Sequence, residues 1–234
     1  MVKQNRVLNF KYIFSFENGL KKEFNVKINL EDLSVVLDSD TRFPDWAMYK
    51  NFRCPHCPGS RKDEEFCPVA VNLDNIIRFF SNFPSYDRVH LVIETNERTY
   101  AKETSLQDGV SSLIGILMPT SGCTVMGRLK PMVRFHLPFS TLEETQYRVM
   151  SMYLLAQYFR MKEGKKPDWE MIDLSNMYEE IKILNQNVCK RIADLEAKDT
   201  SINSVVVLNN FAEYVTFNLD DQNLDELESL FTGF

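Results

Sequence analysis

The interval between apolar residues changes along the chain, and this change constrains the fold more than any other feature of the sequence. In residues 8–14 and 24–28, apolar side chains recur at every second position, which is typical of strands with one buried face. After Ser140 they recur every three or four residues, as they do in helices. We therefore predict an α+β fold in which N-terminal antiparallel hairpins, with a cysteine-rich loop, pack on a C-terminal helical half.

The first 139 residues contain two hairpin patterns and two helical patterns. Each hairpin has two alternating segments around a short polar turn, and each helical segment ends near a proline. Ser34-Val35-Val36-Leu37 is a candidate third strand beside the first hairpin. The expected elements are strands at 8–14, 24–28, 34–37, 89–94 and 98–103, and helices at 73–80 and 106–118.

Residues 140–234 are expected to be helical, and we expect them to form one integrated domain with residues 1–139. Ser140 and Glu143 fit a capping box at the start of a helix. Tyr147–Phe159 is apolar nearly all round, which predicts the central buried helix. Asp168 can cap the next helix, whose apolar seam comprises Leu174, Met177, Ile181, Leu184, Val188, Ile192 and Leu195. The last segment, 224–231, has one apolar face, which we expect to dock on the domain.

The charge of the chain argues against some partners. The formal net charge is −6, and residues 141–234 carry 9 Lys and Arg against 17 Asp and Glu. This acidic half opposes a phosphate backbone, so we expect no nucleic-acid partner. No apolar run reaches about 18 residues and the N-terminus has no signal-peptide pattern, so we expect no membrane partner and a cytoplasmic location.

The most specific motif is a group of cysteines in the proline-rich segment 40–70. Cys54 and Cys57 have C-x2-C spacing, and Cys67 follows after nine intervening residues. Two thiolates in a tight turn and a third from a loop supply most of a tetrahedral metal site. Cys123, beside Gly122 in a break between elements, is our choice for the fourth ligand. The fifth cysteine, Cys189, lies on a helix, where a lone cysteine is usually a small buried hydrophobe.

Several alternatives to a four-cysteine zinc site remain open. His56 or His136 competes with Cys123 as the fourth ligand, and an iron–sulfur cluster also uses four cysteines. The cysteines are also consistent with free thiols and no metal. Cys123 is a candidate nucleophile for an enzyme or redox protein, with one of the two histidines as base. However, four thiolates close the coordination sphere of zinc, which favours a structural role over catalysis.

Five segments with distinctive residues cover much of the chain: CPxCP at 54–58, FCPVAVNL at 66–73, TSGC at 120–123, KPMVRFHLPF at 130–139 and MYLLAQYF at 152–159. Together they resemble a family of uncharacterised bacterial proteins, a domain of unknown function. The resemblance implies a bacterial cytoplasmic protein and names no reaction. The leading hypothesis is a zinc-stabilised, non-catalytic protein that binds another protein or a small ligand, and the alternative is a thiol- or iron–sulfur-dependent redox protein or enzyme.

Overall fold

The computed structural model describes residues 7–57, 65–220 and 224–233, and it has an α+β architecture. Both expected hairpins are present and join into one antiparallel sheet with strand order β2-β1-β3-β4. Its strands are β1 (Val7–Phe16), β2 (Lys21–Asn29), β3 (Arg88–Thr95) and β4 (Thr99–Ser105). The prediction of a third strand at 34–37 is wrong, because this segment forms only an isolated bridge between Val35 and Ile28.

Helices α1 (Pro68–Phe80) and α2 (Leu106–Thr120) form the layer next to the sheet. Alternate residues of β1, among them Tyr12 and Phe14, are fully buried beneath this layer. Gly109 allows α2 to approach closely, since a Cβ atom there would lie 3.0 Å from Leu91 and 3.1 Å from Phe14. The small residue therefore sets the distance between α2 and the sheet.

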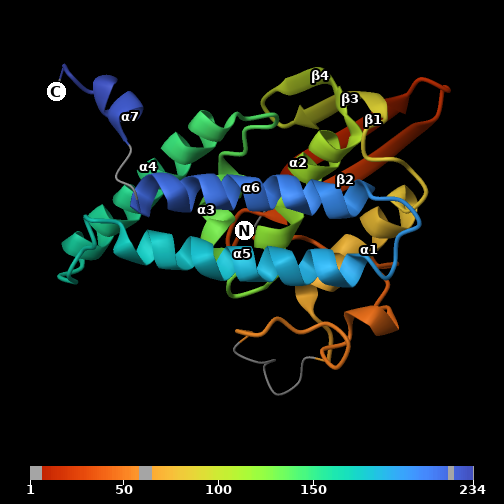
Figure 1. Ribbon diagram of the computed structural model, residues 1–234, viewed down its shortest axis with the longest axis horizontal. Coiled ribbons are helices and arrows are strands. Elements are labelled where there is room, and N and C mark those ends of the chain that lie inside the picture. Colours follow the sequence, from red (N-terminus) through yellow and green to blue (C-terminus); the bar gives the residue numbers. More distant parts are fainter. Residues whose placement is uncertain (1–6, 58–64, 221–223, 234) are drawn as a thin grey trace, which may run out of the picture.

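The outer layer consists of α5 (Ile172–Ile192) and α6 (Thr200–Asp220), which run side by side in Figure 1. Helix α6 packs on both α2 and α5, so residues of the two halves of the chain share one hydrophobic core. The predicted seam of α5 is confirmed, because its members within the helix are all buried. Leu195 lies beyond the helix and is exposed.

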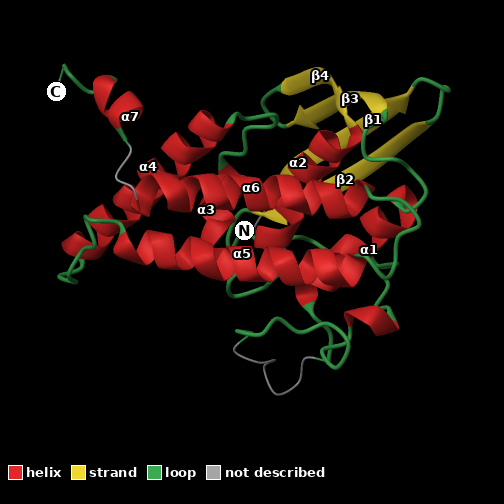
Figure 2. Cartoon of the chain, in the orientation of Figure 1, coloured by secondary structure: helices red, strands yellow, loops and turns green. Residues whose placement is uncertain are grey.

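Helix α4 (Leu142–Lys162) exists, but the prediction that Tyr147–Phe159 is the central buried helix is wrong. Leu155 is 56% exposed and Phe159 is 55% exposed, and the few buried residues of α4 pack mainly against α3 (Lys130–Arg134) and α6. Helix α2 takes the central place instead, because most of its residues are buried and it packs on the sheet, α1 and α6. Figure 2 labels α2 next to the strands. The capping box begins one residue later than expected, with Thr141 and Glu144 exchanging bonds.

The remaining elements are short: η1 (Asp45–Ala47), η2 (Met126–Leu129) and α7 (Asp225–Ser229). Figure 1 places α7 at the end of the molecule nearest α4. Leu227 is buried and the ring of Phe231 stacks on that of Tyr147, with centroids 6.5 Å apart, whereas Leu230 is 63% exposed. The expected docking of 224–231 therefore holds for part of its apolar face. Among the described residues, no helix is long and apolar enough to cross a membrane.

Candidate functional site

The cysteine-rich segment is anchored to the core by side chains other than cysteine. Trp46 donates a 2.9 Å hydrogen bond from Nε1 to Asp74 on α1, and Phe52 is buried beside the Trp46 ring. The amide of Cys67 donates to the carbonyl of Ala47 at 2.8 Å. The described parts of this segment, residues 40–57 and 65–70, thus have more structure than the sequence indicated, and residues 58–64 lie outside the described residues.

Three chain segments bring four cysteines to one place. Cys54 and Cys57 lie in a tight turn, in which the Cys57 amide donates to the Cys54 carbonyl at 3.0 Å. Cys67 immediately precedes α1, and Cys123 follows α2 after Gly122. Gly122 has a φ of +107°, a conformation that favours glycine, and so turns the chain towards Pro68. All four cysteines line one cavity of about 70 Å³.

The surroundings of this cavity are mostly apolar. Its other walls include Tyr49 and Phe52 of the loop and Leu184 and Val188 of α5. Asn187 on α5 contributes a polar contact, donating from Nδ2 to Sγ of Cys54 at 3.5 Å. The cysteine cavity therefore joins the loop, the start of α1, the end of α2 and one face of α5.

Burial favours the thiol form of Cys54, Cys67 and Cys123. Burial, followed by the charges of the other three cysteines, raises the pKa of Cys54 to about 12. Burial also raises the pKa of Cys67, to about 11, and that of Cys123. Backbone amides oppose this effect: those of Val69 and Ala70 lower the pKa of Cys67, although neither makes a regular capping bond to the sulfur. The mutual effects show that the four thiols are close enough to repel one another when ionised.

The side chains line the cavity without meeting at one point. Among the described residues, no group of three or more His, Cys, Asp or Glu side chains is placed closely enough to hold a metal ion. A tetrahedral site would require the four sulfurs to turn inward from the cavity walls, to about 2.3 Å from a common centre.

The two histidines considered as ligands or bases occupy other positions. His136 lies in a different cavity, where Nε2 is 3.2 Å from the hydroxyl of Tyr12 and 3.3 Å from that of Ser112. Both ring nitrogens of His56 are buried, and neither has a hydrogen-bond partner in the part of the chain that the structure describes. His56 is not among the residues lining the cysteine cavity. Cys189 is also elsewhere, with its sulfur 3.8 Å from the carbonyl oxygen of Ile202.

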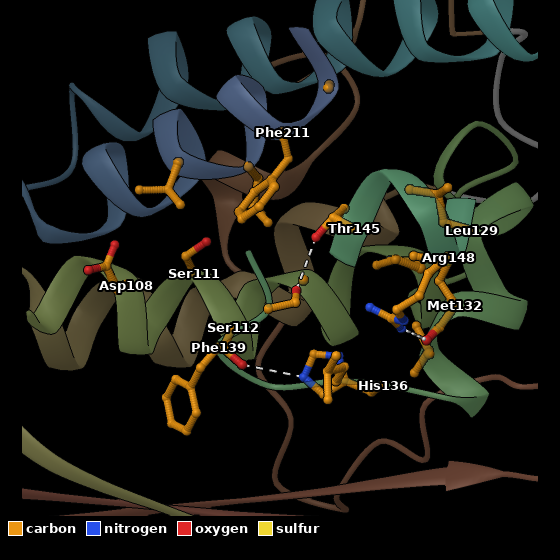
Figure 3. Close-up of a pocket in the computed structure, with 18 of the residues that line it drawn as sticks. Asp108, Ser111, Ser112, Leu129, Met132, His136, Phe139, Thr145, Arg148 and Phe211 are labelled. Carbon is orange, nitrogen blue, oxygen red and sulfur yellow. Dashed lines mark hydrogen bonds between the residues drawn. The ribbon is translucent and has the colours of Figure 1, made fainter. Parts of the chain in front are cut away.

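A larger cavity, which the sequence did not indicate, lies between α2, α3, α5 and α6. Its volume is about 250 Å³, and most of its lining is apolar. Its lining includes Ser112 and Gly115 of α2, Met132 of α3, His136, Arg148 of α4, Tyr178 and Asn185 of α5, and Leu208 and Phe211 of α6. Figure 3 shows Ser112, His136, Arg148 and Phe211 arranged around the same space.

Two polar side chains that line this cavity have binding capacity left: Arg148 forms no salt bridge with a described carboxylate, and Asn185 has an acceptor without a described partner. Arg148 donates from Nη2 to the carbonyls of Met132 at 3.0 Å and Phe135 at 2.7 Å, and no described carboxylate forms a salt bridge with it. Burial lowers the pKa of Arg148, as expected for a cation removed from water. Asn185 is 1% exposed, and its Oδ1 has no hydrogen-bond partner among the described residues.

Comparison with known proteins identifies a family but no function. The model of a family described as a domain of unknown function, DUF6901, matches residues 10–232. The comparison with curated proteins and the comparison with solved structures found no match.

Proposed function

We propose that this chain, which belongs to the DUF6901 family, is a non-catalytic binding protein whose fold is completed by one zinc ion held by Cys54, Cys57, Cys67 and Cys123. The observation that carries the proposal is that these four cysteines, which come from three separate segments, line one small cavity. The fifth cysteine stays outside it. A shared metal ion gives a physical reason for thiols from separate segments to lie around one cavity.

The chemistry of the four donors favours zinc. Soft thiolate ligands in a tetrahedral set select zinc or iron–sulfur clusters among biological metals. The cavity of about 70 Å³ has the volume of roughly two water molecules, which suits a single ion better than four irons with their sulfides. A divalent cation would also remove the repulsion between the thiolates that raises the pKa of Cys54.

The surroundings favour a structural role. Four thiolates leave zinc no open position for a substrate or water. The raised pKa of Cys123 is the opposite of what a nucleophilic cysteine needs, and His136 lies in the other cavity. The cysteines would join the loop to α1, α2 and α5, and structural zinc sites of small peptides contribute about 10–16 kcal/mol to folding. Cysteines that bind zinc must stay reduced, which favours a reducing compartment, so we propose a cytoplasmic location.

The test is metal analysis of the purified protein and of matched cysteine variants. We expect one zinc per chain, with most of it lost in Cys57→Ser because three thiolates hold zinc more weakly than four. Cys189→Ser, which removes a thiol outside the cavity, should retain the full amount. Absence of metal from the wild-type protein, or equal loss from both variants, contradicts the proposal. A brown protein that contains iron would instead indicate a cluster.

A further inference from the structure

We infer that the larger cavity binds a small amphipathic carboxylate that carries a hydrogen-bond donor at its far end, with Arg148 holding the carboxylate and Asn185 accepting from the donor. This inference rests on one part of the proposed function, namely that the protein acts by binding another molecule. The cavity is separate from the cysteines, so it can be tested independently.

The size and lining of the cavity define the body of the ligand. Its volume of about 250 Å³ equals that of roughly eight water molecules in the liquid, which is enough for a compact molecule of about ten non-hydrogen atoms. Side chains of Met132, Leu208 and Phe211 make walls that favour an apolar chain or ring over water. Polar groups occur at only a few places in the lining, as is usual where they fix the orientation of a ligand.

The Arg148 guanidinium provides the anion-binding end. A partly buried cation without a carboxylate is costly, because its desolvation is not offset by an ion pair. The two bonds from Nη2 to the Met132 and Phe135 carbonyls hold the group in place, while a guanidinium has five N–H donors in all. The donors that remain can bind a carboxylate, which would give Arg148 a direct ion pair in addition to the more distant charge of Glu144. Lys102, also in the lining, adds a second cation, and Asp108 is hydrogen-bonded to Ser105.

Asn185 defines the opposite end. Its unpartnered Oδ1 is an acceptor inside a buried wall, and a ligand hydroxyl or N–H group would satisfy it. Tyr178 lines the same cavity as Arg148 and lies seven residues before Asn185 on α5. Seven residues span about 10 Å along a helix. The ligand should therefore present its carboxylate and its donor about this far apart, as in a medium-chain ω-hydroxy acid.

Isothermal titration calorimetry of the full chain with three probes tests the inference. The probes are 8-hydroxyoctanoate, octanoate, which lacks the donor, and 1,8-octanediol, which lacks the charge. We expect 8-hydroxyoctanoate to bind best, octanoate several-fold more weakly, and the diol at least about tenfold more weakly, since a charged hydrogen bond is worth more than a neutral one. Failure of 8-hydroxyoctanoate to bind at about 5 mM, or equal binding of the diol, would overturn the inference.

Variants separate the two ends of the site. Arg148→Gln should weaken binding of both carboxylates at least about tenfold, whereas Arg134→Gln, which removes a nearby charge that does not line the cavity, should change it less than about twofold. Asn185→Leu keeps the bonds of Arg148 intact and should make octanoate and 8-hydroxyoctanoate bind equally. If Asn185→Leu keeps the preference for the hydroxy acid, the role given to Asn185 is wrong.

Metal content measured on the same samples keeps the two proposals distinguishable. Protein that contains zinc but binds no probe contradicts the carboxylate site alone. Protein that binds the hydroxy acid but contains no zinc contradicts the zinc site alone.

Discussion

The hydroxyl of Tyr153 on α4 donates a 2.7 Å hydrogen bond to Oδ2 of Asp168, which precedes α5. The same carboxylate accepts from the amides of Ile172 and Asp173, in the first turn of α5. Asp168 therefore caps α5 and ties it to α4, although it stands outside the helix. Burial works to raise the pKa of Asp168, but the bonds from Tyr153 and the two amides outweigh it and lower the pKa.

Asp168→Ala should destabilise the protein by about 0.5–2 kcal/mol, because the first-turn amides of α5 lose their acceptor. Asp173→Ala is the matched control. It removes an exposed acid from the same turn, and only its interaction with the helix dipole, a few tenths of a kcal/mol, should be lost. Urea unfolding of the two variants measures the difference, and equal losses would show that Asp168 is not the cap.

The exposure of α4 leads to a second prediction. Leu155→Ala should change the free energy of unfolding by less than about 0.5 kcal/mol, since Leu155 is 56% exposed. Leu113→Ala on α2, where the leucine is fully buried, should cost about 2–5 kcal/mol. A large loss for Leu155→Ala in a protein shown to be monomeric by sedimentation would contradict the position of α4.

Two glycines of α2 should respond in opposite ways to alanine. At Gly109 a Cβ atom would press on Leu91 and Phe14, which are fully buried, so Gly109→Ala should destabilise by about 1–3 kcal/mol. At Gly115 the nearest atom, in Leu208, is at an ordinary 3.5 Å, so Gly115→Ala should stabilise by up to about 1 kcal/mol through helix propensity. Thermal melts of both variants provide the measurement, and a stabilising Gly109→Ala would contradict the close packing of α2 on the sheet.

His136 should make stability depend on pH. Burial, followed by the charge of Arg148, lowers its pKa to about 3, below the ordinary value of 6.5. Because the unfolded chain binds a proton that the folded protein does not, stability should fall as the pH decreases from about 6.5 towards 3, by up to about 1.4 kcal/mol per pH unit. His136→Gln should reduce this slope between pH 6.5 and 5, above the range in which most carboxylates titrate. Identical slopes for the two proteins would show that folding does not lower the pKa of His136.

The sequence was informative where a pattern is local. Alternation in residues 8–14 and 24–28 predicted the first hairpin, and the seam from Leu174 to Ile192 predicted the buried face of α5. The C-x2-C spacing and the position of Cys123 in a break between helices were enough to select the four cysteines that share a cavity.

The wrong prediction for α4 has a physical reason. Abundant apolar residues suggested burial, but few positions of α4 are buried, whereas Gly109 allows α2 to pack closely on the sheet. The polar residues that interrupt the apolar sequence of α4 indicate better which side of this helix faces the rest of the protein. Arg148 binds two carbonyls, and Gln157, which is buried, accepts from the amide of Asp168 at 3.0 Å. The larger cavity could not be predicted, because its walls come from elements far apart in the sequence.

The central claim is that Cys54, Cys57, Cys67 and Cys123 together hold one zinc ion. X-ray absorption at the zinc edge of the purified protein measures both the identity and the number of the ligand atoms. We expect a single shell of four sulfur atoms at about 2.3 Å, with no nitrogen or oxygen ligand. A shell that contains nitrogen or oxygen, or a purified protein in which no zinc is bound, would contradict the claim.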